Sequence, residues 1–579
     1  MAFRALTIVF AALSIGAAAP APEAADYDVL IRGGTIYDGS GGAPFAGDVA
    51  ISGDRIAYVG PHAPGRARRE IDARGLAVAP GFINMLSWSN ESLIHDPHGQ
   101  SETRQGITLE VMGEGSSMGP LNPEMKRLMV QRQGDIHYPV SWTSLGDYLE
   151  FMQRRGVTPN LASFVGAGTV RVHELGERDV DPTPEQLDRM RALVRQAMNE
   201  GALGVGSSLI YAPDNFAGTD ELVALASEAA RCGGMYISHM RSEGDRLIEA
   251  VDELIDISRR SGAPAEIYHL KASGRDNWGK LGDVIARVER ARAQGLRITA
   301  DMYTYTAGAT GLDAAMPLWV QDGGLEQWVA RLRDPAIRAR VAREMLAPGQ
   351  GWENLYHGAG AEGVILSDFR NPALRRYAGK TLAEVARERG KSPEETAMDL
   401  VVEDESRVGA TYFLMSEDNV RREVALPWMS FGSDAASIAN EGLFLNSHPH
   451  PRTYGNFARL LGHYVRDEHV IPLREAIRRL TLFPATNLGI SERGALRPGW
   501  FADVVMFDPA RIDAPATYAS PHQYAVGMRN VFINGVQVLR DGAHTGATPG
   551  RFVHGPGWNR CPAPAARSAR LQPHEAVAA

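Results

Sequence analysis

The sequence predicts an α/β protein: a (β/α)8 barrel joined to a small β-sandwich that is built from both ends of the chain. Two observations support this prediction. Short apolar runs that end in polar residues alternate with helical stretches over 80–490, and a closed parallel barrel is the common fold for that alternation. Runs of alternating branched and polar residues, broken by glycine turns, precede and follow this region at 26–79 and 491–555. Such runs are typical of β-strands.

The remaining boundaries follow changes in the character of the chain. The first 25 residues place Arg4 before an apolar run and a small-residue stretch, the pattern of a signal peptide. The run is shorter than the ~20 apolar residues of a membrane span, so we expect a periplasmic or secreted protein with no membrane partner. Residues 312–415 break the strand–helix rhythm and are predicted to be an inserted subdomain. The polar, Ala/Pro-rich segment 559–579 is predicted to be a flexible tail.

The composition excludes several classes of protein. The chain has 579 residues, of which 44% are hydrophobic and 22% charged, as in an ordinary folded protein. Its formal net charge is −9 and no basic stripe is visible, so a nucleic acid is not an expected partner. Cys232 and Cys561 lie outside any C-x-x-C spacing, which excludes a zinc knuckle. The sequence leaves open whether they pair and whether the protein is an oligomer.

The polar residues at the predicted strand ends include the side-chain types that bind metal ions. Reactive side chains of such barrels lie at the C-terminal ends of the strands, where the sequence has Glu114, His239, His269 and Asp434. Zinc accepts imidazole and carboxylate ligands, and a bound divalent ion makes hydroxide available near neutral pH. We therefore expect Glu114, His239 and His269 to bind one divalent ion, with Zn²⁺ as the first expectation. Asp434 is then the general base for the water and the acid for the leaving amine.

Each of these residues also has a structural interpretation. A histidine at a strand end is often a hydrogen-bonded structural residue. Glu114 could accept hydrogen bonds from the loop 115–117, and Asp434 could be the N-cap of the next helix. The spacing alone leaves these alternatives open.

Eight stretches of the chain are together specific for one family: VAPGFIN, SLIYAP, ISHMRSEGD, YHLKASG, DMYTYTAG, FGSDA, HPRTYGNFARLLGHYVR and FPATNLGI. With them, nearly all of the mature chain resembles the N-acyl-D-amino-acid deacylase (D-aminoacylase) family of the amidohydrolase superfamily. The resemblance implies a metal-dependent barrel that hydrolyses the amide of a small acylated amino acid or short peptide. By matching position, it makes His239 and His269 the tight metal ligands and Asp434 the catalytic aspartate. It also implies that the substrate carbonyl and carboxylate contact Tyr211, Lys271, Tyr303 and Arg452.

Two positions depart from the pattern of that family. After PGFI the family has an Asp-x-His-x-His run, and here Leu86 and Trp88 occupy the places of the histidines. Neither side chain ligates a metal, so the resemblance implies one ion and leaves Asp434 freer to act as a base. Glu114 stands where close relatives have a cysteine, and its harder oxygen should let Mn²⁺ or Co²⁺ replace zinc more readily.

Other functions remain as alternatives. A dipeptidase-like or cyclic-amide hydrolase would use the same water chemistry. A non-catalytic binding protein on an amidohydrolase scaffold would explain the missing histidine pair. A serine hydrolase would use GSSMG at 115–119 with Asp434 and His450, but Gly119-Pro120 interrupts the helix that this motif needs. GAGAEG at 358–363 is a false match to a dinucleotide-binding loop, because a strand pattern follows it.

Overall fold

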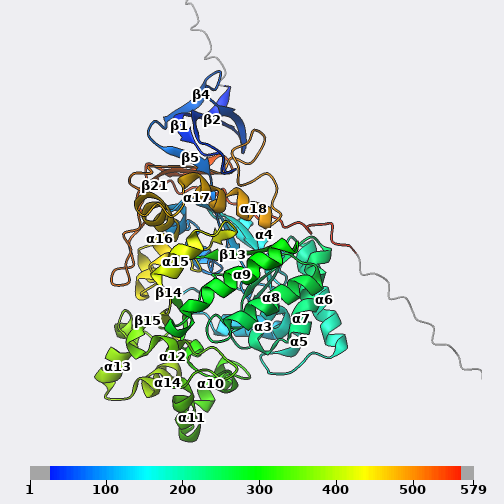
Figure 1. The fold of residues 1–579 in the computed structure, drawn as a ribbon, viewed down its shortest axis with the longest axis vertical. Helices are drawn as coiled ribbons and strands as arrows, with labels where there is room; N and C mark the ends of the chain where they lie inside the picture. Colours follow the sequence, from blue (N-terminus) through cyan, green and yellow to red (C-terminus); the bar gives the residue numbers. More distant parts are fainter. Residues whose placement is uncertain (1–25, 563–579) are drawn as a thin grey trace, which may run out of the picture.

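In the computed structural model, residues 26–562 are described, and they form three parts along the longest axis (Figure 1). A β-rich part lies at the top of this view, the barrel lies in the middle, and a helical subdomain lies at the bottom. The predicted signal peptide and residues 563–579 lie outside the described residues.

Parallel strands form the predicted barrel. In barrel order they are β6 (Phe82–Asn84), β7 (Ile107–Met112), β8 with β9 (Asn160–Ser163 and Val165–Gly166), β10 (Gly204–Ser208), β11 (Met235–His239), β12 (Ala265–Ile267), β13 (Ile298–Met302) and β17 (Met429–Phe431). The Met85 backbone N–H donates to the Phe431 carbonyl at 3.1 Å, and Ser87 forms a parallel bridge with Ala435. These contacts between the first and last strands close the ring.

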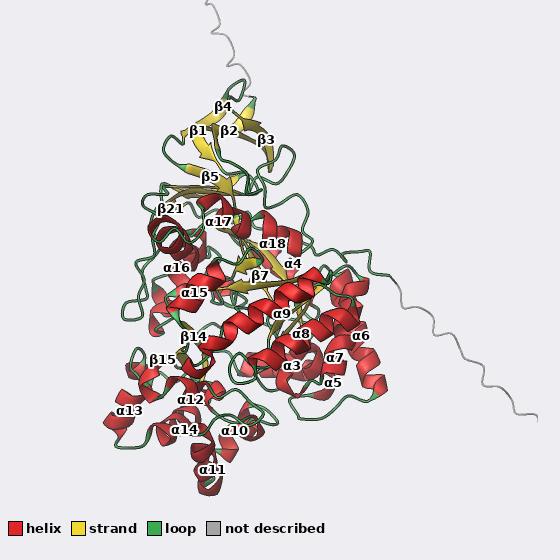
Figure 2. Ribbon diagram, in the orientation of Figure 1, coloured by secondary structure: helices red, strands yellow, loops and turns green. Residues whose placement is uncertain are grey.

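Amphipathic helices cover the outside of the barrel (Figure 2). The predicted helix after Thr183 is α6 (Pro184–Asn199), where Thr183 and Gln186 form a reciprocal capping box. The other helices that follow barrel strands and loops are α1 (Ser92–His95), α2 (Gln100–Thr103), α3 (Pro123–Gln131), α4 (Leu145–Arg155), α5 (Ala167–Leu175), α7 (Thr219–Arg231), α8 (Leu247–Ser261), α9 (Leu281–Ala293), α15 (Glu417–Val424), α16 (Arg452–Arg459), α17 (Leu473–Leu480) and α18 (Leu482–Asn487). None of the described helices combines the length and apolar character needed to cross a membrane.

Both ends of the chain build the β-rich part, as the sequence predicts. One nine-stranded sheet contains β1 (Tyr27–Ile36), β2 (Phe45–Ser52), β3 (Arg55–Gly60), β4 (Ala67–Asp72), β5 (Ala77–Pro80), β18 (Val504–Phe507), β19 (Met528–Ile533), β20 (Val536–Arg540) and β21 (Ala543–His544). The two halves meet where β5 pairs with β18 in antiparallel register, from Ala77 opposite Phe507 to Pro80 opposite Val504.

A subdomain is inserted between β13 and β17. Its antiparallel sheet is made of β14 (Ala307–Gly311), β15 (Val364–Asp368) and β16 (Gly409–Phe413), and its helices are α10 (Leu325–Arg331), α11 (Pro335–Met345), α12 (Leu355–Ala359), α13 (Leu382–Arg389) and α14 (Pro393–Asp404). It has a hydrophobic core of its own. The insertion begins at Ala307, ahead of the predicted boundary at 312.

The C-terminal segment is attached to the barrel. Val553 donates its backbone N–H to Leu161 in β8, and Cys561 forms a disulfide with Cys232 at the end of α7. The predicted flexible tail is therefore wrong for 559–562, because the disulfide holds this part against the barrel.

Candidate active site

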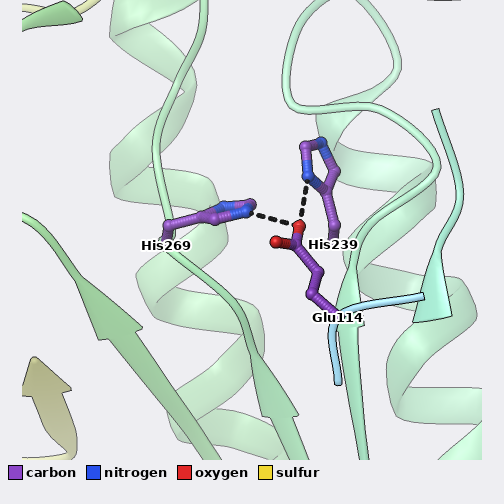
Figure 3. Close-up of side chains that lie close together, drawn as sticks. All are labelled: Glu114, His239 and His269. Atoms are coloured by element: carbon purple, nitrogen blue, oxygen red, sulfur yellow. Dashed lines mark hydrogen bonds and ion pairs between the residues drawn. The ribbon is translucent and has the colours of Figure 1, made fainter. Parts of the chain in front are cut away.

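The three predicted metal ligands lie together at the C-terminal mouth of the barrel (Figure 3). One carboxylate oxygen of Glu114, Oε1, is 2.9 Å from His239 Nδ1 and 3.0 Å from His269 Nε2. All three residues are buried. Glu114 follows β7, His239 ends β11, and His269 follows β12, so the parallel strands bring them to one edge of the barrel.

Two residues of the site have an unusual backbone conformation. His269 has φ 32° and Asp434 has φ 48°, the left-handed region that side chains other than glycine seldom adopt. The Asp301 carboxylate accepts the His269 backbone N–H at 2.9 Å, and the Leu86 carbonyl accepts that of Asp434 at 2.9 Å. Such strained residues concentrate at functional sites, where the surrounding structure holds them.

The electrostatics of the cluster favour a positive charge beside Glu114. Burial acts to raise the pKa of Glu114, but the adjacent His269 and His239 outweigh it and lower that pKa below its ordinary value. Burial and Lys271 act to lower the pKa of His269, yet the Glu243 and Glu114 carboxylates raise it to about 10. The two carboxylates therefore stabilise a cation at this position.

The donor set fits a divalent metal ion. Glu114, His239 and His269 each offer one ligand atom, and these atoms lie within 4.8 Å of one another. Within the described residues, His239 Nδ1 and His269 Nε2 have no hydrogen-bond partner other than Glu114. Two imidazoles, which lose their ring proton when a metal binds, and a carboxylate are a ligand set that zinc accepts, with one position left for water or substrate.

Glu243 is a site residue that the sequence analysis missed. Its Oε1 is 3.0 Å from His269 Nδ1, and its Oε2 is 3.5 Å from His239 Nε2. A carboxylate hydrogen-bonded to the far nitrogen of a metal-binding histidine fixes the ring and its tautomer; this applies to His269, whereas His239 Nε2 has no hydrogen-bond partner among the described residues. Glu243 lies four residues after His239 in the quoted stretch ISHMRSEGD, but only the loop after β11 brings it behind both rings. Glu353 of the inserted subdomain accepts the Glu243 backbone N–H.

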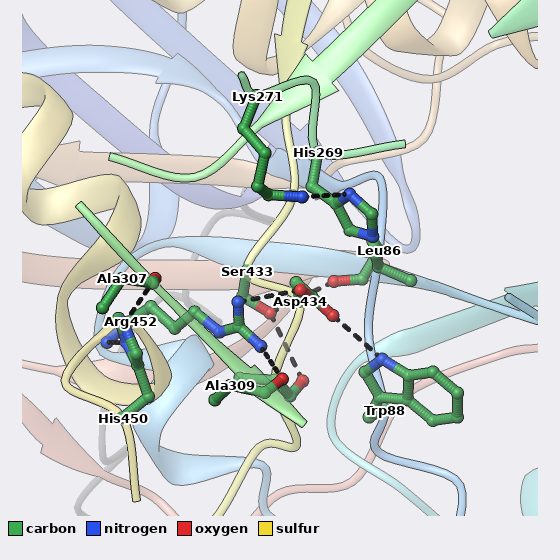
Figure 4. A network of polar contacts seen from close by, with 12 residues as sticks. Leu86, Trp88, His269, Lys271, Ala307, Ala309, Ser433, Asp434, His450 and Arg452 are labelled. Carbon is green, nitrogen blue, oxygen red and sulfur yellow. Dashed lines mark hydrogen bonds and ion pairs between the residues drawn. The ribbon is translucent and has the colours of Figure 1, made fainter. Parts of the chain in front are cut away.

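Asp434 is held at both carboxylate oxygens (Figure 4). The Trp88 indole N–H donates to Oδ1 at 3.0 Å, and Arg452 Nη1 lies 2.8 Å from Oδ2. No helix begins at Asp434, so it is not a helix cap. It is also less free than its expected role as a base suggests, since Trp88 contacts it from a position where the resemblance implies a histidine.

The four residues predicted to bind substrate line one cavity together with Asp434 and the metal-ligand cluster. This cavity measures about 920 Å³ and includes Tyr211, Lys271, Tyr303 and Arg452. Lys271 Nζ donates to Glu243 Oε1 at 2.7 Å and lies 2.7 Å from His269 Nδ1, so its charge stabilises the Glu243 carboxylate behind the His269 ring. The guanidinium of Arg452 lies 4.4 Å from the centre of the Tyr303 ring. Burial raises the pKa of Tyr303 to about 12, so its hydroxyl remains a donor at neutral pH.

His450 does not belong to a serine-hydrolase site. Its Nε2 is 2.9 Å from the Ala307 carbonyl, and its Nδ1 accepts the Arg452 backbone N–H at 3.0 Å. Burial and the charge of Arg452 lower its pKa, so it stays neutral. Ser117 donates its hydroxyl to the Gly119 carbonyl. Both residues are thus engaged with backbone groups, and among the described residues no hydrogen bond joins them, which argues against that alternative.

The wall of the cavity away from the cluster is largely apolar. The apolar residues come from the loop before α3, from α3 itself and from the inserted subdomain: Leu121, Met125, Leu128, Met129, Leu325, Trp328, Leu355 and Leu414. Two cations that line the cavity are already paired with acids of the chain. Arg132 binds Glu177 at 2.7 Å and Glu326 at 2.9 Å, and Arg407 binds Asp313 at 2.7 Å.

Comparisons with known proteins agree with this geometry. The model of the amidohydrolase family matches residues 69–539. A D-aminoacylase of Alcaligenes xylosoxydans xylosoxydans is 32% identical over 91% of this chain and 97% of its own length. The crystal structure of N-acyl-D-glutamate deacylase from Bordetella bronchiseptica, with zinc and a phosphonate inhibitor that mimics the tetrahedral intermediate, has a TM-score of 0.75 and 29% identity over 91% of this chain and 99% of its own. A D-aminoacylase structure that addresses one-metal activation and second-metal attenuation has a TM-score of 0.75 and 31% identity, covering 91% of this chain and all of its own.

Proposed function

Because the chain belongs to the amidohydrolase family, in its D-aminoacylase branch, it is a metal-dependent hydrolase, and we propose that it deacylates N-acyl-D-amino acids. The observation that carries the proposal is the convergence of Glu114, His239 and His269 in the cavity that also contains Asp434 and Arg452. A binding protein on the same scaffold would not need an acid–base group beside a cation site.

The residues of the cavity divide the chemistry among them. A divalent ion held by the cluster would lower the pKa of a water molecule and polarise the scissile carbonyl. Asp434 accepts the proton of the attacking water as the new C–O bond forms. It then gives that proton to the amide nitrogen as the C–N bond breaks, which releases a carboxylic acid and a free amino acid. Arg452 and Tyr303 bind the substrate carboxylate and carbonyl oxygen, because a guanidinium and a neutral phenol are donors to such groups.

We propose that the site works with a single ion, and that this ion is zinc. The support is chemical: Leu86 and Trp88 supply no ligand atom for a second ion, while the cluster supplies two nitrogens and one oxygen. The carboxylate of Glu114 should also let Mn²⁺ or Co²⁺ occupy the site.

We further propose that the preferred substrates carry apolar groups. The apolar wall that includes Met125, Met129 and Trp328 offers contact area to an acyl chain or an apolar side chain. Arg132 and Arg407 could bind an acidic side chain of a substrate, but both are already paired with carboxylates of the protein. Binding such a substrate would require one of these pairs to open.

An exported location is also a proposal. The N-terminal signal-peptide pattern supports it, and so does the disulfide between Cys232 and Cys561, since disulfides persist in oxidising compartments. Cell fractionation with a thiol titration tests it: in its native host the protein should be recovered from the periplasm or medium, and it should show no free thiol when denatured without reductant. Free thiols on both cysteines would contradict the proposal.

The central experiment is a screen of N-acyl-D- and N-acyl-L-amino acids with three proteins: wild type, His239→Ala and His463→Ala. His463 is the matched control because it also lies near two carboxylates, Glu417 and Glu468, but outside the cavity. We expect the D-substrates to be hydrolysed by wild type and His463→Ala, and not by His239→Ala, which should also lose bound metal. Equal activity of His239→Ala and wild type would overturn the proposal, as would hydrolysis of L-substrates alone.

A further inference from the structure

The indole of Trp88 lies in the active-site cavity beside Asp434. It is 38% exposed and lines the catalytic cavity. Its backbone is fixed against the strand end that carries Asp434, because the Trp88 N–H donates to Ala435 O at 3.0 Å and the Asp434 N–H to Leu86 O at 2.9 Å. The indole and the carboxylate are therefore held in register by the backbone on both sides.

The carboxylate of Asp434 has one polar side-chain partner on each oxygen within the described residues. Trp88 donates to Oδ1, and Arg452 contacts Oδ2 (Figure 4). A guanidinium binds a carboxylate most strongly when it contacts both oxygens. The indole bond occupies Oδ1 and so opposes a rotation that would let Arg452 engage both.

We propose that Trp88 is a positioning residue for Asp434. Its indole N–H holds Oδ1, so that Arg452 contacts only Oδ2 and the carboxylate keeps the orientation in which it exchanges a proton in the cavity. The inference rests on the proposed function, in which Asp434 carries the proton. It assigns a role to a residue that supplies no metal ligand and no proton. Loss of the indole N–H then releases Oδ1, and Asp434 becomes a bidentate partner of Arg452.

The test separates the N–H group from the bulk of the ring. One variant is Trp88→Phe, and a second replaces Trp88 by β-(3-benzothienyl)alanine, which keeps the bicyclic shape and has sulfur in place of the N–H. The matched control is Trp319→Phe, because Trp319 also donates its indole N–H to a carboxylate, that of Glu344 at 2.8 Å, outside the cavity. The zinc-loaded enzymes are assayed with N-acetyl-D-leucine.

A hydrogen bond to a charged group stabilises by an amount that corresponds to about ten- to a hundredfold in rate. We expect kcat to fall by that factor in both Trp88 variants, with KM changed much less, and to stay at the wild-type value in Trp319→Phe. Wild-type kcat in the benzothienyl variant would overturn the proposal, because it would leave the ring shape as the only contribution of Trp88.

A second measurement does not depend on turnover. In protein labelled with ¹⁵N-tryptophan, the indole signal missing from Trp88→Phe identifies Trp88. Replacing Asp434→Asn should shift this signal and leave the signal of Trp319 in place; an unshifted Trp88 signal would contradict the contact. If Asp434→Asn keeps wild-type activity, the proposed role of Asp434 fails and the role of Trp88 falls with it. If Asp434→Asn is inactive but the benzothienyl variant is fully active, only the Trp88 proposal fails.

Discussion

Arg452 and Asp434 form a buried ion pair in which the guanidinium nitrogen Nη1 lies 2.8 Å from Oδ2, with side-chain exposures of 3% and 12%. The residue predicted to bind the substrate carboxylate thus already contacts Asp434, the proposed acid–base group. A substrate carboxylate that binds Arg452 would draw on the same guanidinium, so substrate binding and the position of Asp434 are coupled through one side chain.

Arg452→Lys tests this coupling. Lysine keeps the charge but cannot contact two groups in the plane of a guanidinium. We expect kcat/KM for an N-acyl-D-amino acid to fall by about ten- to a hundredfold, through both a lower kcat and a higher KM. Arg459→Lys, a partly buried arginine outside the cavity, is the control. A change confined to KM would show that Arg452 binds substrate without affecting Asp434.

Glu114→Gln and Glu114→Cys test the metal site. The amide is a poor metal ligand, so we expect Glu114→Gln to lose its ion and about a hundredfold or more in activity, since even groups behind metal ligands contribute about 10–100-fold. The thiolate of Glu114→Cys should retain zinc but reduce the activity supported by Mn²⁺ relative to Zn²⁺. Elemental analysis after dialysis against a chelator measures the metal content. One ion per chain in Glu114→Gln would rule out Glu114 as a required ligand.

Asp313→Asn tests the proposed preference for apolar substrates. Asp313 is buried and accepts a hydrogen bond from Arg407 Nε at 2.7 Å. Removing its charge leaves Arg407 with an unpaired charge facing the cavity. We expect kcat/KM for N-acetyl-D-glutamate relative to N-acetyl-D-leucine to rise by about tenfold, as for a new charged hydrogen bond. The same ratio in Asp313→Asn and wild type would argue against this wall as the specificity site. Asp322→Asn, outside the cavity, is the control.

Glu102 and Glu110 make stability depend on pH. Both are fully buried. Burial raises the pKa of Glu110 to about 7, while burial and the charge of Glu110 raise that of Glu102. A carboxyl whose folded pKa is raised stabilises the fold fully below its unfolded pKa, and this contribution is lost as pH rises through the folded pKa. We therefore expect the free energy of unfolding to fall between pH 5 and pH 8.

Glu110→Gln is the matching variant, because glutamine imitates the protonated acid. We expect its loss of stability between pH 5 and pH 8 to be smaller than that of wild type by about 1–3 kcal/mol, measured by urea unfolding. Glu124→Gln, at an exposed position on α3, should leave the slope unchanged. A wild-type slope in Glu110→Gln would show that Glu110 is already ionised at pH 5.

The strand pattern of the sequence was sufficient to predict the barrel and the ligand cluster. Each apolar run ends where a parallel strand ends, and the barrel geometry then brings Glu114, His239 and His269 to one edge. Glu243 and the Trp88–Asp434 bond could not be predicted in this way. Both depend on how a loop turns after its strand. His239 and Glu243 are four residues apart but lie outside a helix, and Trp88 and Asp434 are 346 residues apart, so neither spacing indicates contact.

The disulfide and the inserted subdomain show the same limit. Cys232 and Cys561 are 329 residues apart, and their pairing follows from the path of the C-terminal segment along β8. The break in the strand–helix pattern at 312–415 indicated a separate unit, but its contact with the active site, through Glu353 and Glu243, depends on how the subdomain packs against the barrel.

The pairing of β5 with β18 sets an order for biosynthesis. Residues 81–503 separate the two strands along the chain, so the edge of β5 opposite β1 has no partner until nearly the whole polypeptide has been synthesised. An unpaired strand edge can pair with another chain and cause aggregation. Nascent chains that stall or terminate before β18 should therefore depend on chaperones to stay soluble, even when their barrel strands are complete.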